Sequence, residues 1–198
     1  MTATPRRGRR PGAPDTRAAI LESARESFGQ KGFAGTSVRA VASRAGVDAA
    51  LVHHYFGTKD DLFLSAMELP VDIRAVVARV AAGGVEGAAE RLLTVFLEVW
   101  DDPELTPVFV GRMRQLLEPG GERLLGQGLV PVVFGPAGVA LGIDAPEQRM
   151  PLVVSQMLGL ILTRYVLGVE PIASMPADLV VATYAPTIQR YLTGDLPA

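Results

Sequence analysis

His53 and His54 are adjacent and are the only histidines in the 198 residues. Successive side chains on a regular helix point about 100° apart, so the two rings cannot reach one metal ion together. No third type of ligand clusters with them. We therefore predict no metal site and no catalytic residues. Their ring nitrogens can donate hydrogen bonds to phosphate, more readily when protonated, which favours a surface that faces DNA.

Other enzyme chemistry also lacks its residues. The chain has no cysteine, which excludes disulfides, thiol catalysis and cysteine-ligated metal sites. Neither standard Gly-rich phosphate loop is present. We predict a protein that is not an enzyme and has no cofactor. The most apolar stretch has only 14 residues, between Arg149 and Arg164, whereas a membrane span needs roughly 20. We therefore expect a buried helix there and a cytoplasmic protein.

Charge is unevenly distributed along the chain. Through Lys59 there are ten basic and four acidic residues, a balance of +6, whereas the remainder has nine basic and 17 acidic residues, a balance of −8. A basic end on an acidic body is the layout expected of a nucleic-acid-binding protein. Residues 1–14, with three prolines and four arginines, are predicted to form a flexible basic arm. The arm either contacts DNA or only solvates the chain end.

The elements that position the histidines are short helices. A first helix is predicted to begin near Asp15 or Thr16, either of which can cap it, and to stop near Gly32. A second helix follows Thr36. Gly46 then permits a tight turn into a third helix, from about Asp48 to Phe56. Two short helices joined by a Gly-containing turn are typical of a helix-turn-helix.

Small and apolar residues support the helix-turn-helix, and a capping pair follows it. Ala42 is small where the two helices cross, and Val47 and Val52 are predicted to pack the helices together. Thr58 caps a fourth helix, and Asp61 completes a variant of the capping box.

A longer run of residues resembles a known family. The segments 41–47 (VASRAGV) and 55–63 (YFGTKDDLF) resemble the signature of the TetR family of transcriptional regulators, and the resemblance covers roughly residues 15–67. It implies an all-α fold with an N-terminal three-helix helix-turn-helix DNA-binding domain and a C-terminal helical ligand-binding and dimerisation domain. We place the domains at 15–60 and 61–198, after the arm.

The resemblance also implies which residues contact DNA. Two departures stand out: Asp48 replaces the usual Ser cap, and His53 takes the place of a Tyr that contacts phosphate in the family. The expected DNA-binding residues are Thr36, Ser37, Arg39, Asp48, Ala49, Ala50, Leu51, His53, His54, Tyr55 and Lys59.

The front of the recognition helix suggests how DNA is read. If Val52 and Phe56 point inward, Ala49, Ala50 and Leu51 form an exposed apolar trio, and apolar side chains in the major groove contact thymine methyl groups. The alternative is that Leu51 packs in the core.

The remaining chain is predicted to be helical, without a persistent strand pattern. The segment 130–134 (VPVVF) resembles a strand but has no partner. The predicted helices span 59–69, 71–82, 85–100, 104–117, 121–134, 146–168 and 176–193.

Two sets of apolar residues in this half could have a function, although ordinary core packing explains each set as well. Arg112, Arg114 and Arg164 could select an anionic effector or form surface salt bridges. The candidate pocket residues are Phe96, Trp100, Phe109, Met113, Phe134, Met157 and Tyr165. The candidate dimer residues, spaced for a seam between helices, are Leu152, Val153, Gln156, Leu160, Ile188 and Tyr191.

Together these features predict a homodimeric repressor that binds a double-stranded DNA operator and is released by a small-molecule effector. The alternative is a regulator of the same fold without an inducer, either an activator or a partner-controlled protein. An enzyme is the least supported class.

Overall fold

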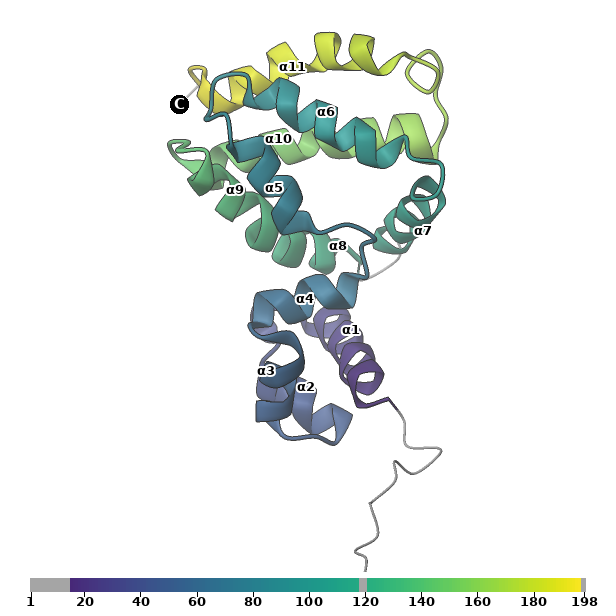
Figure 1. Cartoon of the computed structure of the whole chain (residues 1–198), viewed down its shortest axis with the longest axis vertical. Helices are drawn as coiled ribbons and strands as arrows, with labels where there is room; N and C mark the ends of the chain where they lie inside the picture. The colour runs from purple at the N-terminus through teal and green to yellow at the C-terminus, as the bar shows by residue number, and fades with distance from the viewer. Residues whose placement is uncertain (1–14, 118–120, 197–198) are drawn as a thin grey trace, which may run out of the picture.

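The computed structural model describes residues 15–117 and 121–196, and the predicted basic arm lies outside these ranges. Figure 1 shows a small head built from the first four helices below a larger helical body. The described residues contain helices and no strand, which confirms the all-α prediction. None of these helices combines the length and apolar character that a membrane span requires. The head contains α1 (Thr16–Gly35), α2 (Val38–Ala45), α3 (Ala49–Phe56) and α4 (Lys59–Met67).

Each head helix begins at a side chain that caps it. Asp15, Asp48 and Thr58 are among the predicted caps, whereas the Ser37 cap of α2 was not predicted. The Asp48 carboxylate accepts from the Ala50 backbone N–H at 2.7 Å, and the Ser37 hydroxyl accepts from the Ala40 N–H at 3.1 Å. At α4, Thr58 and Asp61 form the predicted reciprocal capping box. These bonds satisfy N–H groups that a helix start leaves without a backbone partner.

The head has its own aromatic core. Phe28 and Phe63 are buried and meet edge to face with ring centroids 5.2 Å apart, and Phe33 packs against Phe63 at 5.4 Å. This core also includes Leu62 and Met67 of α4. We therefore propose a domain boundary after Met67 in place of the predicted boundary at 60/61.

The body is a set of packed helices in which α6 and α11 run side by side over α10 (Figure 1). Its core includes fully buried Leu93, Val153, Val180 and Ile188. The elements are α5 (Ile73–Ala81), α6 (Ala88–Trp100), α7 (Thr106–Leu116), α8 (Gly121–Leu124), η1 (Leu125–Phe134), α9 (Gly135–Ala140), α10 (Pro146–Leu160), η2 (Ile161–Val166) and α11 (Ala177–Thr193).

Two of the predicted body helices change their winding. The segment 121–134 passes from α8 into the π-helix η1, and 146–168 passes from α10 into the π-helix η2. A π-turn closes its hydrogen bond one residue later than an α-turn. The strand-like segment 130–134 is therefore helical. The short helix α9 was not predicted, because Gly135, Pro136 and Gly138 read as helix breakers.

Candidate nucleic-acid interface and effector cavity

The turn between α2 and α3 sets the angle of the helix-turn-helix. Gly46 has φ 69° and ψ 31°, the left-handed conformation that glycine adopts without steric cost. The N–H of Val47 donates to the Ala42 carbonyl at 3.0 Å and closes the end of α2. Ala42 and Val52 are buried where the two helices meet. The turn thus holds α3 on the surface of the head.

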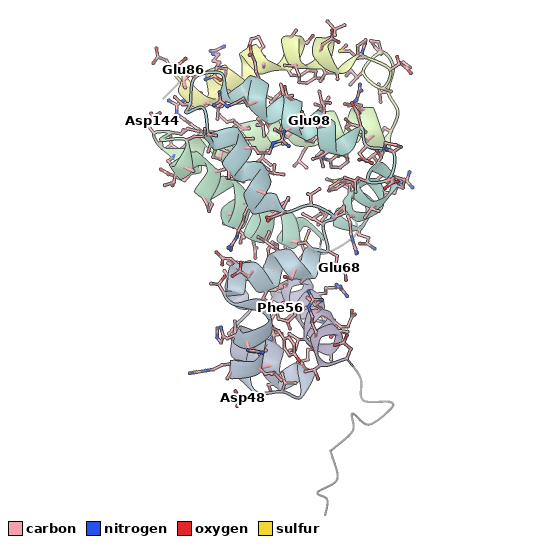
Figure 2. The ribbon with its side chains drawn as sticks, viewed as in Figure 1. Asp48, Phe56, Glu68, Glu86, Glu98 and Asp144 are labelled. Carbon is pink, nitrogen blue, oxygen red and sulfur yellow. The ribbon has the colours of Figure 1, made fainter. Side chains whose placement is uncertain are left out.

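The recognition helix α3 presents a mixed face to the outside. Figure 2 places Asp48 at the lower tip of the head and Phe56 inside it, and Phe56 is buried. His54 and Ala50 are exposed, and Tyr55 keeps 44% of its surface in solvent.

The predicted apolar trio is only partly exposed. Ala50 is exposed, whereas Ala49 and Leu51 are half-buried, and Ala49 packs against the head core. The expectation of three exposed apolar side chains is therefore wrong for two of them. The reason is that the start of α3 packs on the head core, which includes Val41 and Ala42 of α2.

The His53 side chain forms a hydrogen bond at the C-terminal end of the recognition helix. Its Nδ1 donates to the carbonyl oxygen of Gly57 at 2.8 Å. In the neutral ring this bond leaves Nε2 as an acceptor, so His53 can donate to a phosphate only when it is protonated. This helix-closing role was not predicted, because it depends on how the chain turns at Gly57.

Thr36 does not present its hydroxyl to the outside. It is 3% exposed, and its Oγ1 lies 2.9 Å from the Ser27 carbonyl oxygen and 2.8 Å from that of Gly32. Gly32 breaks α1 with φ 70°, and Thr36 binds the carbonyls that this break leaves free. The expectation that Thr36 contacts DNA is therefore wrong as to its side chain. Ser37 and Arg39 beside it are exposed.

Lys59 begins α4 on the same side of the head as Phe33. Its Nζ lies 4.3 Å from the centroid of the Phe33 ring, a distance that allows a cation–π contact. Partial burial lowers the pKa of Lys59 from its ordinary value, and neighbouring Asp60 partly offsets that effect. The aromatic ring thus positions this cation at the start of a helix.

A cavity of about 210 Å³ lies inside the body, and its wall is hydrophobic except for Arg112. Helices α5, α6, α7 and α10 provide most of the lining, and η1, together with Met67 and Leu69 at the end of the head, adds to it. Of the predicted pocket residues, the wall includes Phe96, Trp100, Phe109, Met113, Phe134 and Met157.

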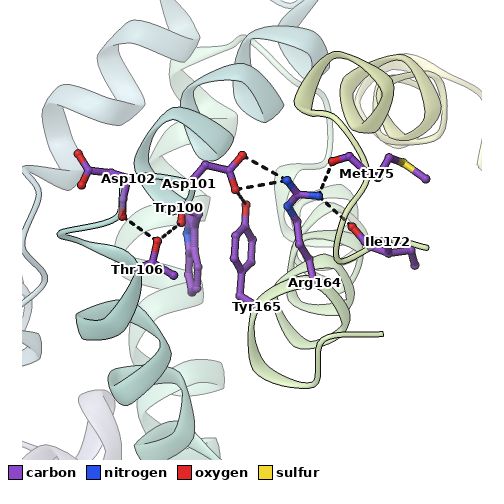
Figure 3. A network of polar contacts seen from close by, with 8 residues as sticks. All are labelled: Trp100, Asp101, Asp102, Thr106, Arg164, Tyr165, Ile172 and Met175. Atoms are coloured by element: carbon purple, nitrogen blue, oxygen red, sulfur yellow. Dashed lines mark hydrogen bonds and ion pairs between the residues drawn. The ribbon is translucent and has the colours of Figure 1, made fainter. Parts of the chain in front are cut away.

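Tyr165 lies behind that wall, in a polar network rather than in the lining (Figure 3). Its ring centroid is 5.0 Å from that of Trp100, and its hydroxyl donates to Asp101 at 2.8 Å. Burial, together with this carboxylate, raises the pKa of Tyr165. The expectation that Tyr165 lines the pocket is wrong, because Asp101 draws its polar end away from the cavity.

Arg164 belongs to the same network and is not available to an effector. Its Nη1 donates to the carbonyl oxygens of Ile172 at 2.9 Å and Met175 at 2.7 Å (Figure 3). Its Nη2 pairs with Asp101 at 3.4 Å. Arg164 thus holds the loop before α11, and of the three arginines singled out in the sequence only Arg112 reaches the cavity.

The predicted dimer seam is mostly internal. Val153, Leu160 and Ile188 are 0%, 1% and 0% exposed within one protomer, so the expectation that these three contact a second subunit is wrong. They pack the core between α10 and α11. Leu152 and Gln156 are half-buried, and Tyr191 packs against the same core.

Comparison with known proteins identifies the class. Residues 20–66 match the family model described as "Bacterial regulatory proteins, tetR family", and residues 86–192 match "Tetracyclin repressor-like, C-terminal domain". The chain therefore belongs to the TetR family, which consists of regulatory proteins rather than enzymes.

The curated relatives are similar over less than half of the chain. The HTH-type transcriptional regulator BetI 1 of Chromohalobacter salexigens is 36% identical over 83 residues, 41% of each chain. BetI of Burkholderia thailandensis is 32% identical over 91 residues, 46% of this chain and 47% of that one. The chain thus aligns with less than half the length of these curated relatives. A TetR-family regulator of known structure from Streptomyces coelicolor A3 is 38% identical, with 93% of this chain and 98% of that chain covered and a TM-score of 0.48.

Proposed function

We propose that this protein is a sequence-specific DNA-binding repressor that acts as a homodimer and is released from its operator by a small molecule. The observation that carries the proposal is the recognition helix α3, which is capped by Asp48 and exposes Ala50, His54 and Tyr55 at the tip of the head. Its length and the Gly46 turn suit the major groove of B-DNA, which admits one α-helix.

Contacts to the DNA backbone come from the residues around this helix. Ser37 and Arg39 are exposed at the start of α2, and Lys59 lies at the start of α4. Helix N-termini and cations both bind phosphate. The full set proposed to contact DNA is Ser37, Arg39, Asp48, Ala50, His53, His54, Tyr55 and Lys59.

A matched pair of substitutions tests DNA binding. Binding sites are first selected from a random-sequence DNA library, and affinity is then measured by fluorescence anisotropy. Ala50→Glu places a carboxylate against the groove and is expected to weaken binding by about 100-fold or more. Ala82→Glu, at another exposed alanine, which lies in the body, is the control and should bind as the wild type does. Equal affinity of both variants would reject α3 as the reading helix.

The dimer is proposed to form through the outer faces of α10 and α11. Ser155 and Gly159 of α10 and Thr183 and Thr187 of α11 are exposed, and small residues let two helices approach closely. Half-buried Leu152 and Gln156 lie on the same face of α10. Two-fold symmetry would place two heads on the two half-sites of an operator.

Light scattering after size-exclusion chromatography tests this interface. Wild-type protein is expected at the mass of two chains. Gly159→Arg puts a long charged side chain on the proposed face and should give the mass of one chain. Gly111→Arg is the control, because Gly111 is exposed on α7 and, like Gly159, has no neighbour within 4 Å of an added Cβ. A dimeric Gly159→Arg variant would place the interface elsewhere.

Control by an effector is supported by the apolar cavity, which favours an inducible regulator over one without an inducer.

Repression is tested with a reporter gene downstream of the selected site. Expression should fall when the protein is present, and a rise would instead indicate an activator.

A further inference from the structure

Glu68 forms ion pairs on both sides of the junction between the head and the body. Glu68 ends α4 in the left-handed conformation with φ 48°. Its carboxylate pairs with Arg25 of α1 through one oxygen and with Arg112 of α7 through the other. Figure 2 places Glu68 where the head meets the body. The carboxylate therefore bridges two cations that belong to different parts of the molecule.

Two cavities meet at the same point. Beside the apolar cavity lies a second one of about 190 Å³, whose wall includes the polar side chains of Arg25, Arg112 and Gln115. Arg112, Met67 and Leu116 line both cavities. The apolar cavity thus adjoins a second cavity whose wall carries the two guanidinium groups of Arg25 and Arg112.

The ionic partners at this junction can be exchanged. Arg25 also pairs with the solvent-exposed Glu22 at 2.9 Å and donates to the Ala66 carbonyl at 3.2 Å, so it keeps partners if Glu68 moves. Arg112 has the Gln115 side-chain oxygen at 3.1 Å and otherwise Glu68. The Glu68 side chain is 43% exposed, and water can solvate it after release. A second carboxylate can therefore replace Glu68 at Arg112 with little change in total ionic pairing.

The apolar cavity limits the rest of such a ligand. Because an apolar cavity of 150 Å³ holds benzene, one of 210 Å³ accommodates about eight carbons. Exchanging one carboxylate for another at Arg112 gains little binding free energy, so burial of these carbons supplies most of the affinity of the ligand.

We propose that the effector is an amphipathic anion, a carboxylate on an apolar chain of about eight carbons, whose chain fills the apolar cavity and whose carboxylate displaces Glu68 from Arg112. This inference rests on the proposed control by an effector and names its ligand class and the contact that it breaks. Release of Glu68 removes the ionic contact between the end of α4 and α7, so the head is held on the body by fewer contacts, mainly those of α1 with α8 and η1. DNA affinity falls to the extent that the ligand binds this second state more tightly.

Isothermal titration of the full chain with octanoate, 1-octanol and octylammonium tests the ligand class. Octanoate is expected to bind about tenfold or more tightly than 1-octanol, because Arg112 bonds to a charged acceptor. Octylammonium should bind more weakly than either. Arg112→Gln should weaken octanoate binding to the level of 1-octanol, and Arg114→Gln on the same helix is the control. Val76→Phe, which fills the cavity, should weaken both ligands.

Glu68→Gln tests the exchange of carboxylates. The substitution removes the charge that competes for Arg112, so octanoate affinity should rise severalfold. Octanoate should also lower the DNA affinity of this variant less than it lowers that of the wild type. Thermal melting of every variant checks that it is folded. Equal binding of octanoate and 1-octanol, or octanoate binding that Arg112→Gln does not change, would overturn the inference.

DNA binding measured on the same samples separates this inference from the proposed function. If DNA binds but octanoate shows no preference over 1-octanol, only the ligand class fails. If octanoate binding depends on Arg112 but no DNA binds, the ligand class stands and the proposed function fails.

Discussion

The head and the body begin their helices in different ways. All four head helices start at a side-chain cap, from Asp15, Ser37, Asp48 and Thr58. In the body α5 has one, from Asp72, whereas α6, α7, α9, α10, α11 and both π-helices have none. The head helices thus begin at capping side chains, whereas most body helices begin without one, and three of these have a proline in their first turn instead.

The interiors differ as well. Pro131, Pro151 and Pro186 lie inside body helices, where proline removes a backbone hydrogen bond, and the π-helices accommodate part of that irregularity. The head has an aromatic core with the smaller cavity at its edge, whereas the body surrounds the larger, apolar cavity. The head is therefore packed to hold one shape against DNA, whereas the body is packed around an enclosed apolar space.

The largest test of this contrast removes one phenylalanine from each region. Phe63→Ala empties the head core, where Phe63 is fully buried, and should lower the free energy of unfolding by about 3–5 kcal/mol. Phe96 is half-buried and already faces the cavity, so Phe96→Ala should cost roughly half as much. Urea unfolding measures both changes. Equal costs would show that the body is packed as tightly as the head.

The next largest effect is expected at the turn of the helix-turn-helix. Gly46→Ala forces a Cβ into the left-handed conformation and should destabilise the protein by about 1–2 kcal/mol. No atom lies within 4 Å of that Cβ, so the cost is conformational and not a clash. Thermal unfolding measures it. An unchanged melting temperature would mean that the turn can adopt another conformation.

A smaller, pH-dependent effect is expected at the α4 cap. The hydroxyl of Thr58 donates to the Asp61 carboxylate and, with the Thr58 backbone N–H and nearby Arg74, holds the pKa of Asp61 below its ordinary value despite partial burial. A lowered pKa gives stability that is fully present above the ordinary Asp value of about 3.9 and is lost as pH falls through the folded value. Asp61→Asn should therefore cost about 1 kcal/mol at pH 7 and little at pH 2. Urea unfolding at both pH values checks this, and a gap that stays constant would contradict it.

The smallest effect is expected to have the opposite sign. Gly111 is an exposed glycine inside α7, and a Cβ there meets no atom within 4 Å. Gly111→Ala should stabilise the protein by about 0.5–1 kcal/mol, because alanine loses less conformational entropy in a helix. The melting temperature should rise. A fall would show that the body helices depend on local flexibility.

The features that sequence predicted well are those fixed by neighbours in the chain. The recognition helix, its Asp48 cap, the Gly46 turn and the capping box of Thr58 and Asp61 each depend on residues within about one helical turn. The structure and the family comparison confirm the helix-turn-helix and the all-α fold.

The features that sequence missed depend on distant contacts. Thr36 is buried because α1 breaks four residues earlier and needs its hydroxyl. Val153 and Ile188 have the spacing of a dimer seam, but the same spacing suits an internal contact between α10 and α11, and periodicity cannot separate the two. The bridge at Glu68 joins residues 43 and 44 positions away, Arg25 and Arg112, which no local pattern relates.

The contrast between caps and cavity wall also bears on how such a protein changes in evolution. A cap needs a particular kind of side chain, so positions such as Asp48 and Thr58 tolerate few replacements. The cavity wall needs only apolar volume, and aliphatic residues of similar size exchange there at small cost. Residues such as Val76, Val99 and Leu158 can therefore drift without unfolding the chain. Under the proposed function, exchanges in the cavity wall would change the molecule that is sensed and leave the reading of DNA by the head unaltered.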